Sequence, residues 1–246
     1  MVLRSETRLF TAVVFRVGFA LAALLVPLAS AQTYTYEVRH QDWHGGAKGT
    51  LRISPDSIAF EEHGKKGKAD PRQWSYEEIQ QLTIGKSEVR VLTYEDSKWK
   101  LGRDREYVFD RIPSDLATEV YPLLSGTLDQ RLVAAVADPQ AAPEWKIGAK
   151  LTQNLKGTTG TLAAGPDLIV FDTKKPDEAR SWRIADIQNV TSSGPFDLTI
   201  TTGEKGGVFR GERQFHFQLQ QALSEDQYNA LWRRVNRSKG LTFLEP

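Results

Sequence analysis

Histidine is the residue type that most often binds metals or transfers protons near neutral pH, and this chain has four among 246 residues. His40 and His44 are four residues apart, a spacing that would place both on one face of a helix and suit a metal ion there. Here the pair straddles a strand-like segment and a glycine-rich turn, so the two side chains need not point the same way. His216 lies between Phe215 and Phe217 and therefore points to the opposite face from those rings. The histidines predict no metal site, and we expect His216 on the surface.

Other catalytic signatures are missing from the sequence. No serine stands in a Gly-x-Ser-x-Gly turn, there is no cysteine, and no glycine-rich phosphate loop ends in Lys-Ser or Lys-Thr. Four glycines cluster between Gly203 and Gly211, but such a cluster indicates a hairpin loop before it indicates a binding site. Carboxylates are scattered along the chain. We therefore expect a protein that is not an enzyme and that uses no cofactor.

Two basic loops in the first half of the chain give a sharper signal, which indicates that they bind an anion. Near an anionic membrane each basic residue contributes about 1 kcal/mol, and an exposed Trp suits a membrane interface. The alternative is a pair of solvated turns, since four nearby acidic residues dilute the charge, and the second half of the chain has no matching patch. The candidate residues are Lys65, Lys66, Lys68 and Arg72 in the first loop and Lys98, Trp99, Lys100 and Arg103 in the second, with Arg105 beside them.

The elements that must position these residues follow a pattern that occurs twice. A glycine-rich strand start, a Pro-Asp turn and two apolar positions recur at an offset of 111 residues, and each copy is followed by Trp-x4-Ile, with later matches at an offset of 108. The change of offset falls between Phe60 and Trp74 and places a three-residue length difference in a loop. The matched residues are Gly49-Thr50-Leu51, Pro55-Asp56, Ile58, Phe60 and Trp74 in the first copy and Gly160-Thr161-Leu162, Pro166-Asp167, Ile169, Phe171 and Trp182 in the second. This repetition predicts two copies of one small fold.

Within each copy, apolar and polar residues alternate with the period of two that is typical of half-buried strands. A polar or glycine-containing segment separates each such stretch from the next. The expected strands of the first copy lie near 34–39, 50–53, 58–61, 74–76, 89–93 and 107–109. Those of the second copy lie near 145–149, in a hairpin over 160–171, and near 182–184, 196–200 and 215–217.

A helical period follows the strands of each copy. Leu116, Val120, Leu123 and Leu124 form one apolar stripe after Ser114, although Pro122 favours a kink. Thr127-x-x-Gln130 resembles a capping box and predicts a second helix with Leu128, Leu132 and Val136 as its stripe. An extended linker is expected over Asp138 to Pro143. Ser224-x-x-Gln227 is the capping box of the last helix, with Tyr228, Leu231, Trp232 and Val235 as its stripe.

Residues 1–31 have the order of a secretory signal peptide. Three arginines up to Arg16 precede an apolar run of about ten residues, too short to span a bilayer, and Ala29-Ser30-Ala31 supplies small residues before the cleavage site. Cleavage after Ala31 removes three Arg and one Glu, which leaves 29 basic and 30 acidic residues. This near-neutral balance argues against a dedicated nucleic-acid binder. Without cysteine, each copy must be held by its own hydrophobic core.

Several short strands, a Trp at mid-copy and one C-terminal amphipathic helix resemble the pleckstrin-homology-like (PH-like) fold, and the Trp-x4-Ile stretch before a strand is similar to bacterial PH-like and GRAM-like domains. The resemblance covers residues 34–125 and 145–238. It implies that Trp74 and Trp182 are core residues. Members that bind lipid headgroups use basic residues in the first strand–strand loop, where this chain has only Lys48 and Lys156, one in each copy.

The expected fold class is therefore mainly β with C-terminal helices: two PH-like sandwiches or partly open barrels, each of about seven antiparallel strands capped by an α-helix. The expected division is a signal peptide at 1–31, a first domain at 32–137, a linker at 138–144 and a second domain at 145–246. We expect an exported, periplasmic or extracellular module that binds a protein or peptide partner in the cell envelope. The alternative is an anionic lipid or other anionic ligand, bound through the two basic loops.

Overall fold

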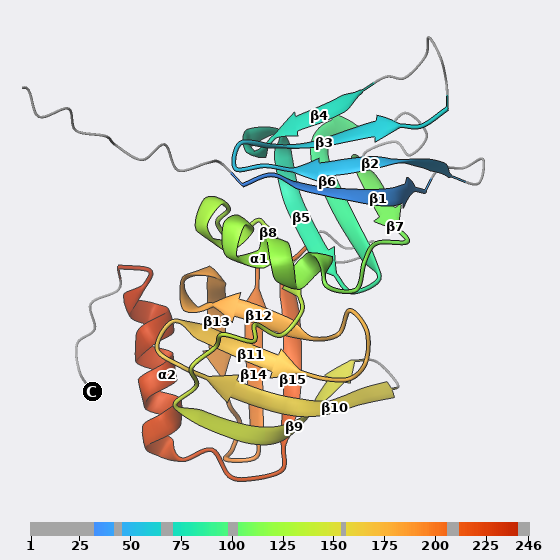
Figure 1. The fold of residues 1–246 in the computed structure, drawn as a ribbon. Helices are drawn as coiled ribbons and strands as arrows, with labels where there is room; N and C mark the ends of the chain where they lie inside the picture. Colours follow the sequence, from blue (N-terminus) through green and yellow to red (C-terminus); the bar gives the residue numbers. More distant parts are fainter. Residues whose placement is uncertain are drawn as a thin grey trace, which may run out of the picture. The chain divides into compact units, whose positions relative to one another are not determined.

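The computed structural model describes residues 32–41, 46–64, 71–97, 103–153, 156–205 and 212–240. The described chain is mostly β-strand, with two α-helices, one of which is C-terminal (Figure 1). None of the helices in these ranges is long and apolar enough to cross a bilayer.

The strands and helices occur in the same order in both copies of the sequence pattern. We call β1 to α1 the first repeat and β9 to α2 the second repeat. The first consists of β1 (Tyr34–His40), β2 (Ala47–Ile53), β3 (Ser57–Glu62), β4 (Arg72–Ser75), β5 (Ile79–Gly85), β6 (Glu88–Asp96), β7 (Asp104–Asp110) and α1 (Leu116–Thr127). The second consists of β9 (Trp145–Gln153), β10 (Lys156–Ala164), β11 (Leu168–Asp172), β12 (Arg180–Arg183), β13 (Ile187–Thr191), β14 (Asp197–Thr202), β15 (Arg213–Leu219) and α2 (Glu225–Arg237). A short 3-10 turn precedes β5 and β13, at Tyr76–Glu78 and Ile184–Asp186.

Pairing of the described strands also repeats. They form one hydrogen-bonded sheet of 15 strands in the order β13-β14-β15-β9-β10-β11-β12-β8-β5-β6-β7-β1-β2-β3-β4. The run β5-β6-β7-β1-β2-β3-β4 has the same order as β13-β14-β15-β9-β10-β11-β12, so corresponding strands have corresponding neighbours. The strand β8 (Leu132–Ala135) has no counterpart among the described residues and joins the two runs.

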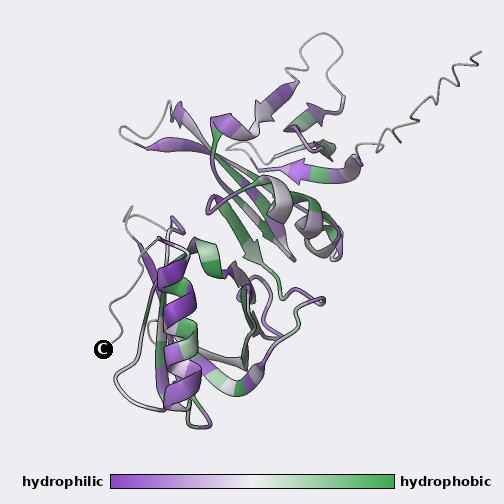
Figure 2. Ribbon diagram, turned by 90° about the vertical axis from the view of Figure 1, so that its left-hand side faces the viewer, coloured by the Kyte–Doolittle hydropathy of each residue, from purple (hydrophilic) through white to green (hydrophobic). Residues whose placement is uncertain are grey.

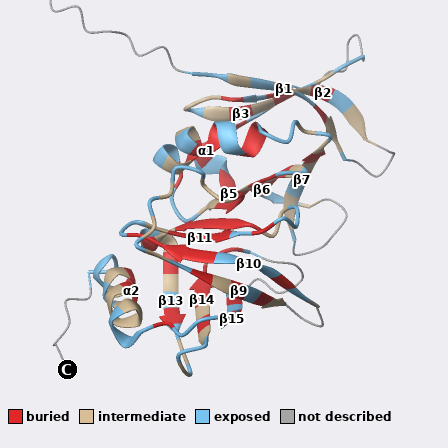
Figure 3. Cartoon of the chain, turned by 60° about the horizontal axis from the view of Figure 1, so that its bottom comes forward, coloured by how far each residue is buried: buried red, intermediate tan, exposed pale blue. Residues whose placement is uncertain are grey.

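Each repeat has its own hydrophobic core, as the sequence predicts for a chain without cysteine. One cluster of buried side chains runs from Val38 to Val136 and the other from Ile147 to Val235. Leu51 and Leu162 are fully buried at equivalent places, each paired with a phenylalanine of the next strand. Buried and exposed residues alternate along many strands, and apolar residues gather inside (Figures 2 and 3). This alternation confirms that the period-two patterns mark half-buried strands.

The tryptophans of the repeated motif are core residues in both repeats. Trp74 packs against Tyr107 with ring centroids 4.6 Å apart, and Trp182 packs against Phe215 at 4.8 Å. Both indoles are about 95% buried. The core role that the resemblance implies for Trp74 and Trp182 is confirmed.

The last helix begins as its capping box predicts. The Ser224 hydroxyl accepts from the Gln227 N–H, and the Gln227 side chain accepts from the Ser224 N–H. Leu231 and Val235 are buried, and Tyr228 and Trp232 are partly buried against the same core. Helix α1 begins one residue after Asp115 and continues through Pro122, and its predicted stripe faces the first core.

The predicted second helix after α1 is wrong. Leu128 ends α1, and residues 132–135 form β8, which pairs in parallel with β5 and touches β12 at Ser181 opposite Ala134. The Leu82 N–H also donates to the Arg131 carbonyl, 2.8 Å away, which extends the pairing. Two strand edges, at β5 and β12, offer unpaired backbone groups to this segment, and satisfying them outweighs a weak helical pattern.

Candidate functional site

The described histidines have different surroundings. The His216 side chain is exposed and lies 2.9 Å from the Thr199 hydroxyl, which confirms its predicted surface position. His63 is also exposed, 2.8 Å from the Thr50 hydroxyl. His40 packs among three aromatic rings of the first core, with centroids 5.5–5.8 Å away, and His44 lies outside the described residues. Among the residues described, no three His, Cys, Asp or Glu side chains form a group that could hold a metal ion.

One small cavity of about 260 Å³ lies beside the segment between β8 and β9. Ala142, Pro143 and Val170 line part of its wall, together with Asp138 and Asp167. It falls below the roughly 300–1,000 Å³ that is typical of ligand pockets. We therefore place no site there.

Six of the eight candidate anion-binding residues lie outside the described residues, namely Lys65, Lys66, Lys68, Lys98, Trp99 and Lys100. The other two are described: Arg103 is exposed just before β7, and Arg72 begins β4. The Arg72 guanidinium lies over the Tyr107 ring, 5.0 Å from its centroid, and that of Arg105 lies 4.8 Å from the same centroid. The strands that carry the two basic loops therefore meet at Tyr107.

In the first repeat the carboxylate of Glu95 lies beside Arg105 and Tyr107. Glu95 accepts a hydrogen bond from the Tyr107 hydroxyl at 3.1 Å and one from Arg105 at 3.3 Å. Its side chain is 53% exposed. Burial raises the pKa of the Tyr107 hydroxyl; the charge of Arg105 opposes this effect and the hydrogen bond to Glu95 adds to it. Arg72 makes no ion pair with any residue in the described part of the chain.

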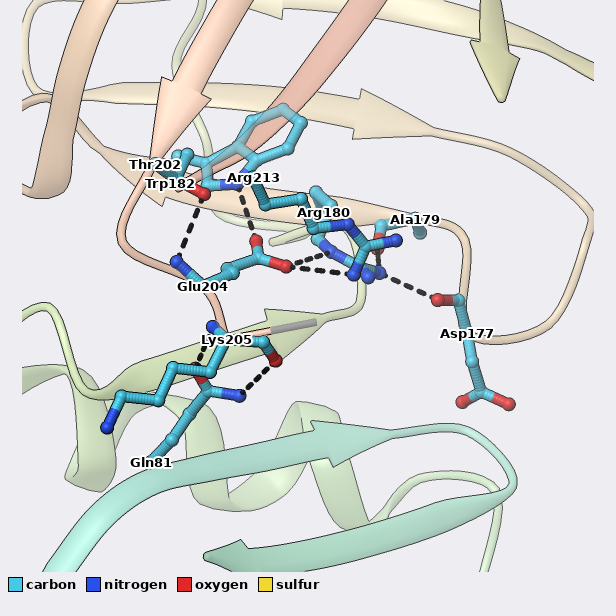
Figure 4. Close-up of polar contacts among 9 residues, drawn as sticks. All are labelled: Gln81, Asp177, Ala179, Arg180, Trp182, Thr202, Glu204, Lys205 and Arg213. Atoms are coloured by element: carbon cyan, nitrogen blue, oxygen red, sulfur yellow. Dashed lines mark hydrogen bonds and ion pairs between the residues drawn. The ribbon is translucent and has the colours of Figure 1, made fainter. Parts of the chain in front are cut away.

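The second repeat holds the same set of side chains 108 residues later, and Figure 4 shows most of it. Arg180 and Arg213 lie 5.6 Å and 4.8 Å from the Phe215 centroid, as Arg72 and Arg105 lie over Tyr107. Trp182 packs on Phe215 as Trp74 packs on Tyr107. We call Arg72, Trp74, Arg105 and Tyr107 the first arginine pair site, and Arg180, Trp182, Arg213 and Phe215 the second.

In the second site a buried carboxylate fills the space between the donors. Glu204 accepts from the Trp182 indole N–H at 2.9 Å, from Arg180 Nε at 3.4 Å and from Arg213 Nη1 at 3.3 Å (Figure 4). The side chains of Arg180 and Glu204 are only 7% and 6% exposed. Burial lowers the pKa of the Arg213 guanidinium, and the Glu204 carboxylate opposes that effect. Charge-assisted hydrogen bonds in such a site are stronger than exposed ones.

Residues of the first repeat lie against this end of the second repeat. The Lys205 N–H donates to the Gln81 side chain at 2.6 Å, and the Gln81 amide donates to the Lys205 carbonyl at 3.3 Å (Figure 4). The Asp177 carboxylate accepts from the Ser87 N–H at 3.1 Å. Contacts from the first repeat thus flank the second arginine pair site.

The strand edges beside the two arginine pair sites also differ, because only one of them carries a further described strand. The edge of β12 carries β8, and the contact is reinforced because the Ser181 hydroxyl donates to the Val136 carbonyl and accepts from the Asp138 N–H, both at 2.8 Å. The corresponding strand β4 is the last strand of the sheet, with no further strand beside it among the described residues. In the part of the chain that the structure describes, the edge that carries a strand in the second repeat therefore carries none in the first.

Sequence reasoning chose Arg72 as one of several loop charges and did not see that its position repeats. The signal was available: Arg72-x-Trp74 matches Arg180-x-Trp182, and Arg105-x-Tyr107 matches Arg213-x-Phe215. Glu204 also has a counterpart, because Thr93-x-Glu95 matches Thr202-x-Glu204, and in both repeats the Glu N–H donates to the Thr hydroxyl at 3.3 Å. This match stands at an offset of 109 rather than 108, so a comparison at a fixed offset misses it.

No family model matches the sequence, and no curated protein matches it. Among solved structures, the C-terminal domain of an unknown protein from Leishmania infantum is 13% identical, with a TM-score of 0.30, over 49% of this chain and 94% of that one. The Spt16D Pob3N heterodimer structure is 9% identical, with a TM-score of 0.31, over 70% and 84%. A complex of PDZ-RhoGEF DH/PH domains with RhoA is 10% identical, with a TM-score of 0.27, over 41% and 30%. Similar structures thus include proteins with PH domains, but scores of this size decide nothing about function.

Proposed function

We propose that the protein is a non-enzymatic, exported binding module of two tandem PH-like domains, and that it binds an extended peptide segment of a partner protein along the edge of β4. The PH-like assignment is supported by the strand order that both repeats share, by their separate cores and by the helix that ends each. The proposed domains are 32–137 and 145–246, joined by 138–144.

The observation that carries the binding function is the strand β8 on the edge of β12. The strand β12 is the counterpart of β4 in the second repeat, and this chain already places an extended segment, β8, along the edge of β12. Strand addition obtains affinity from main-chain hydrogen bonds. The segment β8 meets β12 through one antiparallel bridge and the Ser181 hydroxyl, and we expect Gln73, which has the place of Ser181 in β4, to contact an added segment of another protein. Among the described residues β4 pairs only with β3, so no described strand occupies its other edge.

A fluorescent peptide of alternating Val and Glu tests strand addition when its backbone is methylated in two ways. Methyl groups on every second amide N–H remove the ladder bonds of one peptide edge and leave all side chains in place. One methylated version should lose binding by about tenfold or more, because several bonds of roughly 1 kcal/mol each are lost; the version methylated on the opposite edge should bind like the parent.

Hydrogen exchange with the unmethylated peptide bound should show new protection in Arg72–Ser75. Equal binding by both methylated versions, or protection confined to another strand, would contradict strand addition at β4.

Export rests on the order of residues 1–31. We expect the protein recovered from outside the cytoplasm to begin at Gln32, as read by mass spectrometry of its N-terminal peptide. Ala31→Tyr, which places a bulky residue before the cleavage site, should leave the precursor uncleaved, whereas Val2→Ala at the start should be cleaved normally. Recovery of the mature fraction with Met1 still present would argue against a signal peptide.

The second candidate function is attachment to an anionic lipid or another anionic ligand through the two basic loops. The meeting of Arg72 and Arg105 at one ring favours it, since both loops leave the fold near that point. Salt-sensitive co-sedimentation with vesicles that contain phosphatidylglycerol would support this function over peptide binding.

A further inference from the structure

The two arginine pair sites differ in the partners of their donor groups. In the second site the donors converge on the carboxylate of Glu204, which belongs to the chain itself. The first site has the same donor types at equivalent positions, but no residue in the described ranges accepts a hydrogen bond from the Arg72 guanidinium or from the Trp74 indole N–H.

Glu95 fills only part of the corresponding space. It contacts Arg105 and the Tyr107 hydroxyl, and no carboxylate of the described residues pairs with Arg72. The Tyr107 hydroxyl is itself a difference between the repeats, because Phe215 has no group that could draw the acid toward the ring edge. An outside carboxylate therefore finds one guanidinium that pairs with no described residue and a second that is shared with Glu95.

We propose that the first arginine pair site binds a carboxylate side chain of the peptide segment that adds to β4, in the way that the second site binds Glu204. This inference rests on the proposed function and deepens it: the partner segment is extended and acidic. Arg72 belongs to β4 itself, and cross-strand neighbours have Cβ atoms about 4.5–5.5 Å apart. A Glu of the added strand beside Arg72 is therefore within reach of its guanidinium.

The test compares the alternating Val and Glu peptide with a peptide in which Gln replaces every Glu. The protein should bind the Glu peptide about tenfold or more tightly than the Gln peptide, since hydrogen bonds to charged groups are the stronger ones. Arg72→Ala should abolish this preference. Arg52→Ala is the matched control, because it removes the same charge from an exposed ion pair on β2 and should leave the preference unchanged.

Exchanging the charges of the protein and the peptide distinguishes a lost charge pair from a general loss of peptide binding. Arg72→Glu should bind a peptide of alternating Val and Lys more tightly than the unchanged protein does. Thermal unfolding of each variant should stay close to that of the unchanged protein. Arg72 is partly exposed and makes no ion pair with a described residue, and the loss of its contact with the Tyr107 ring costs only about 0.5–1 kcal/mol.

Each other outcome overturns the proposal. Equal binding of the Glu and Gln peptides, both still sensitive to backbone methylation, would leave strand addition standing and refute the carboxylate site. Failure of both peptides to bind would refute strand addition and the carboxylate site together. Loss of co-sedimentation with phosphatidylglycerol vesicles in Arg72→Ala, with peptide binding unchanged, would assign the site to a lipid phosphate instead.

Discussion

Glu204→Ala is expected to lower the free energy of unfolding of the second core by about 3–5 kcal/mol. The substitution removes the acceptor that neutralises Arg180, whose side chain is 7% exposed, and leaves the Trp182 indole N–H without its partner. A buried guanidinium without a counter-ion is strongly unfavourable, because water cannot replace the lost carboxylate. Arg213 loses an ion pair as well, but it is 33% exposed and so suffers less.

Hydrogen exchange followed by mass spectrometry is the suitable measurement, because it reports the two cores separately. Amides of β12, β14 and β15 should exchange faster in Glu204→Ala, while those of β2 and β3 should keep their rates. Glu95→Ala is the matched control in the first repeat. The Glu95 side chain is 53% exposed, and exposed pairs contribute about 0–1 kcal/mol, so this variant should be almost neutral.

A double variant separates the loss of charge balance from the loss of packing. Arg180→Met with Glu204→Leu removes both buried charges and keeps apolar volume, and such replacements are often neutral or stabilising. The double variant should recover a large part of the lost stability. Equal destabilisation by Glu204→Ala and Glu95→Ala would mean that the buried contacts of Glu204 contribute no more to stability than the exposed contacts of Glu95. That result would contradict the prediction.

Local patterns predicted most of the fold because they report burial directly. The alternation around Leu51 and Leu162, the two tryptophans and the Ser224 capping box all describe contacts within one strand, hairpin or helix turn, and all are found where expected. The element order followed from finding the pattern twice, since a repeated pattern of core positions requires a repeated fold.

The segment after α1 shows where such reasoning fails. Leu128, Leu132 and Val136 have a helical spacing, yet residues 132–135 form a strand. What decides is the presence of two strand edges, β5 and β12, that come from distant parts of the chain. No property of the segment itself encodes that pairing.

The candidate site was predicted in part for a related reason. Arg72 was selected for its charge, whereas its importance comes from its place beside Trp74 and over Tyr107, which the structure reveals. Glu204 was not selected, because its match to Glu95 is one residue out of step with the neighbouring matches, and only the fold brings it to Arg180. The lysines of the two basic loops lie outside the described residues and stay predictions.

Gly49→Ala and Gly160→Ala should each lower the free energy of unfolding by about 3 kcal/mol, the upper end of the usual cost of overpacking. These glycines open the repeated motif, and each faces the carbonyl and the aromatic ring of the neighbouring strand. A Cβ at Gly49 would lie 2.3 Å from the Glu61 carbonyl oxygen, and one at Gly160 would lie 2.3 Å from that of Asp172. Backbone oxygens in a paired strand cannot move away cheaply, so β2 and β3, or β10 and β11, must separate.

Gly126→Ala is the control with the opposite expected sign. Gly126 lies in the last turn of α1, and a Cβ there meets nothing within 4 Å. Alanine in a helix is favoured over glycine by about 0.5–1 kcal/mol, so this variant should be more stable. Denaturation in urea, with exchange rates assigned to each core, should show the first core weakened by Gly49→Ala and the second by Gly160→Ala. If either substitution weakened both cores equally, the two repeats would unfold as one cooperative unit. The prediction that the two cores unfold independently would then be wrong.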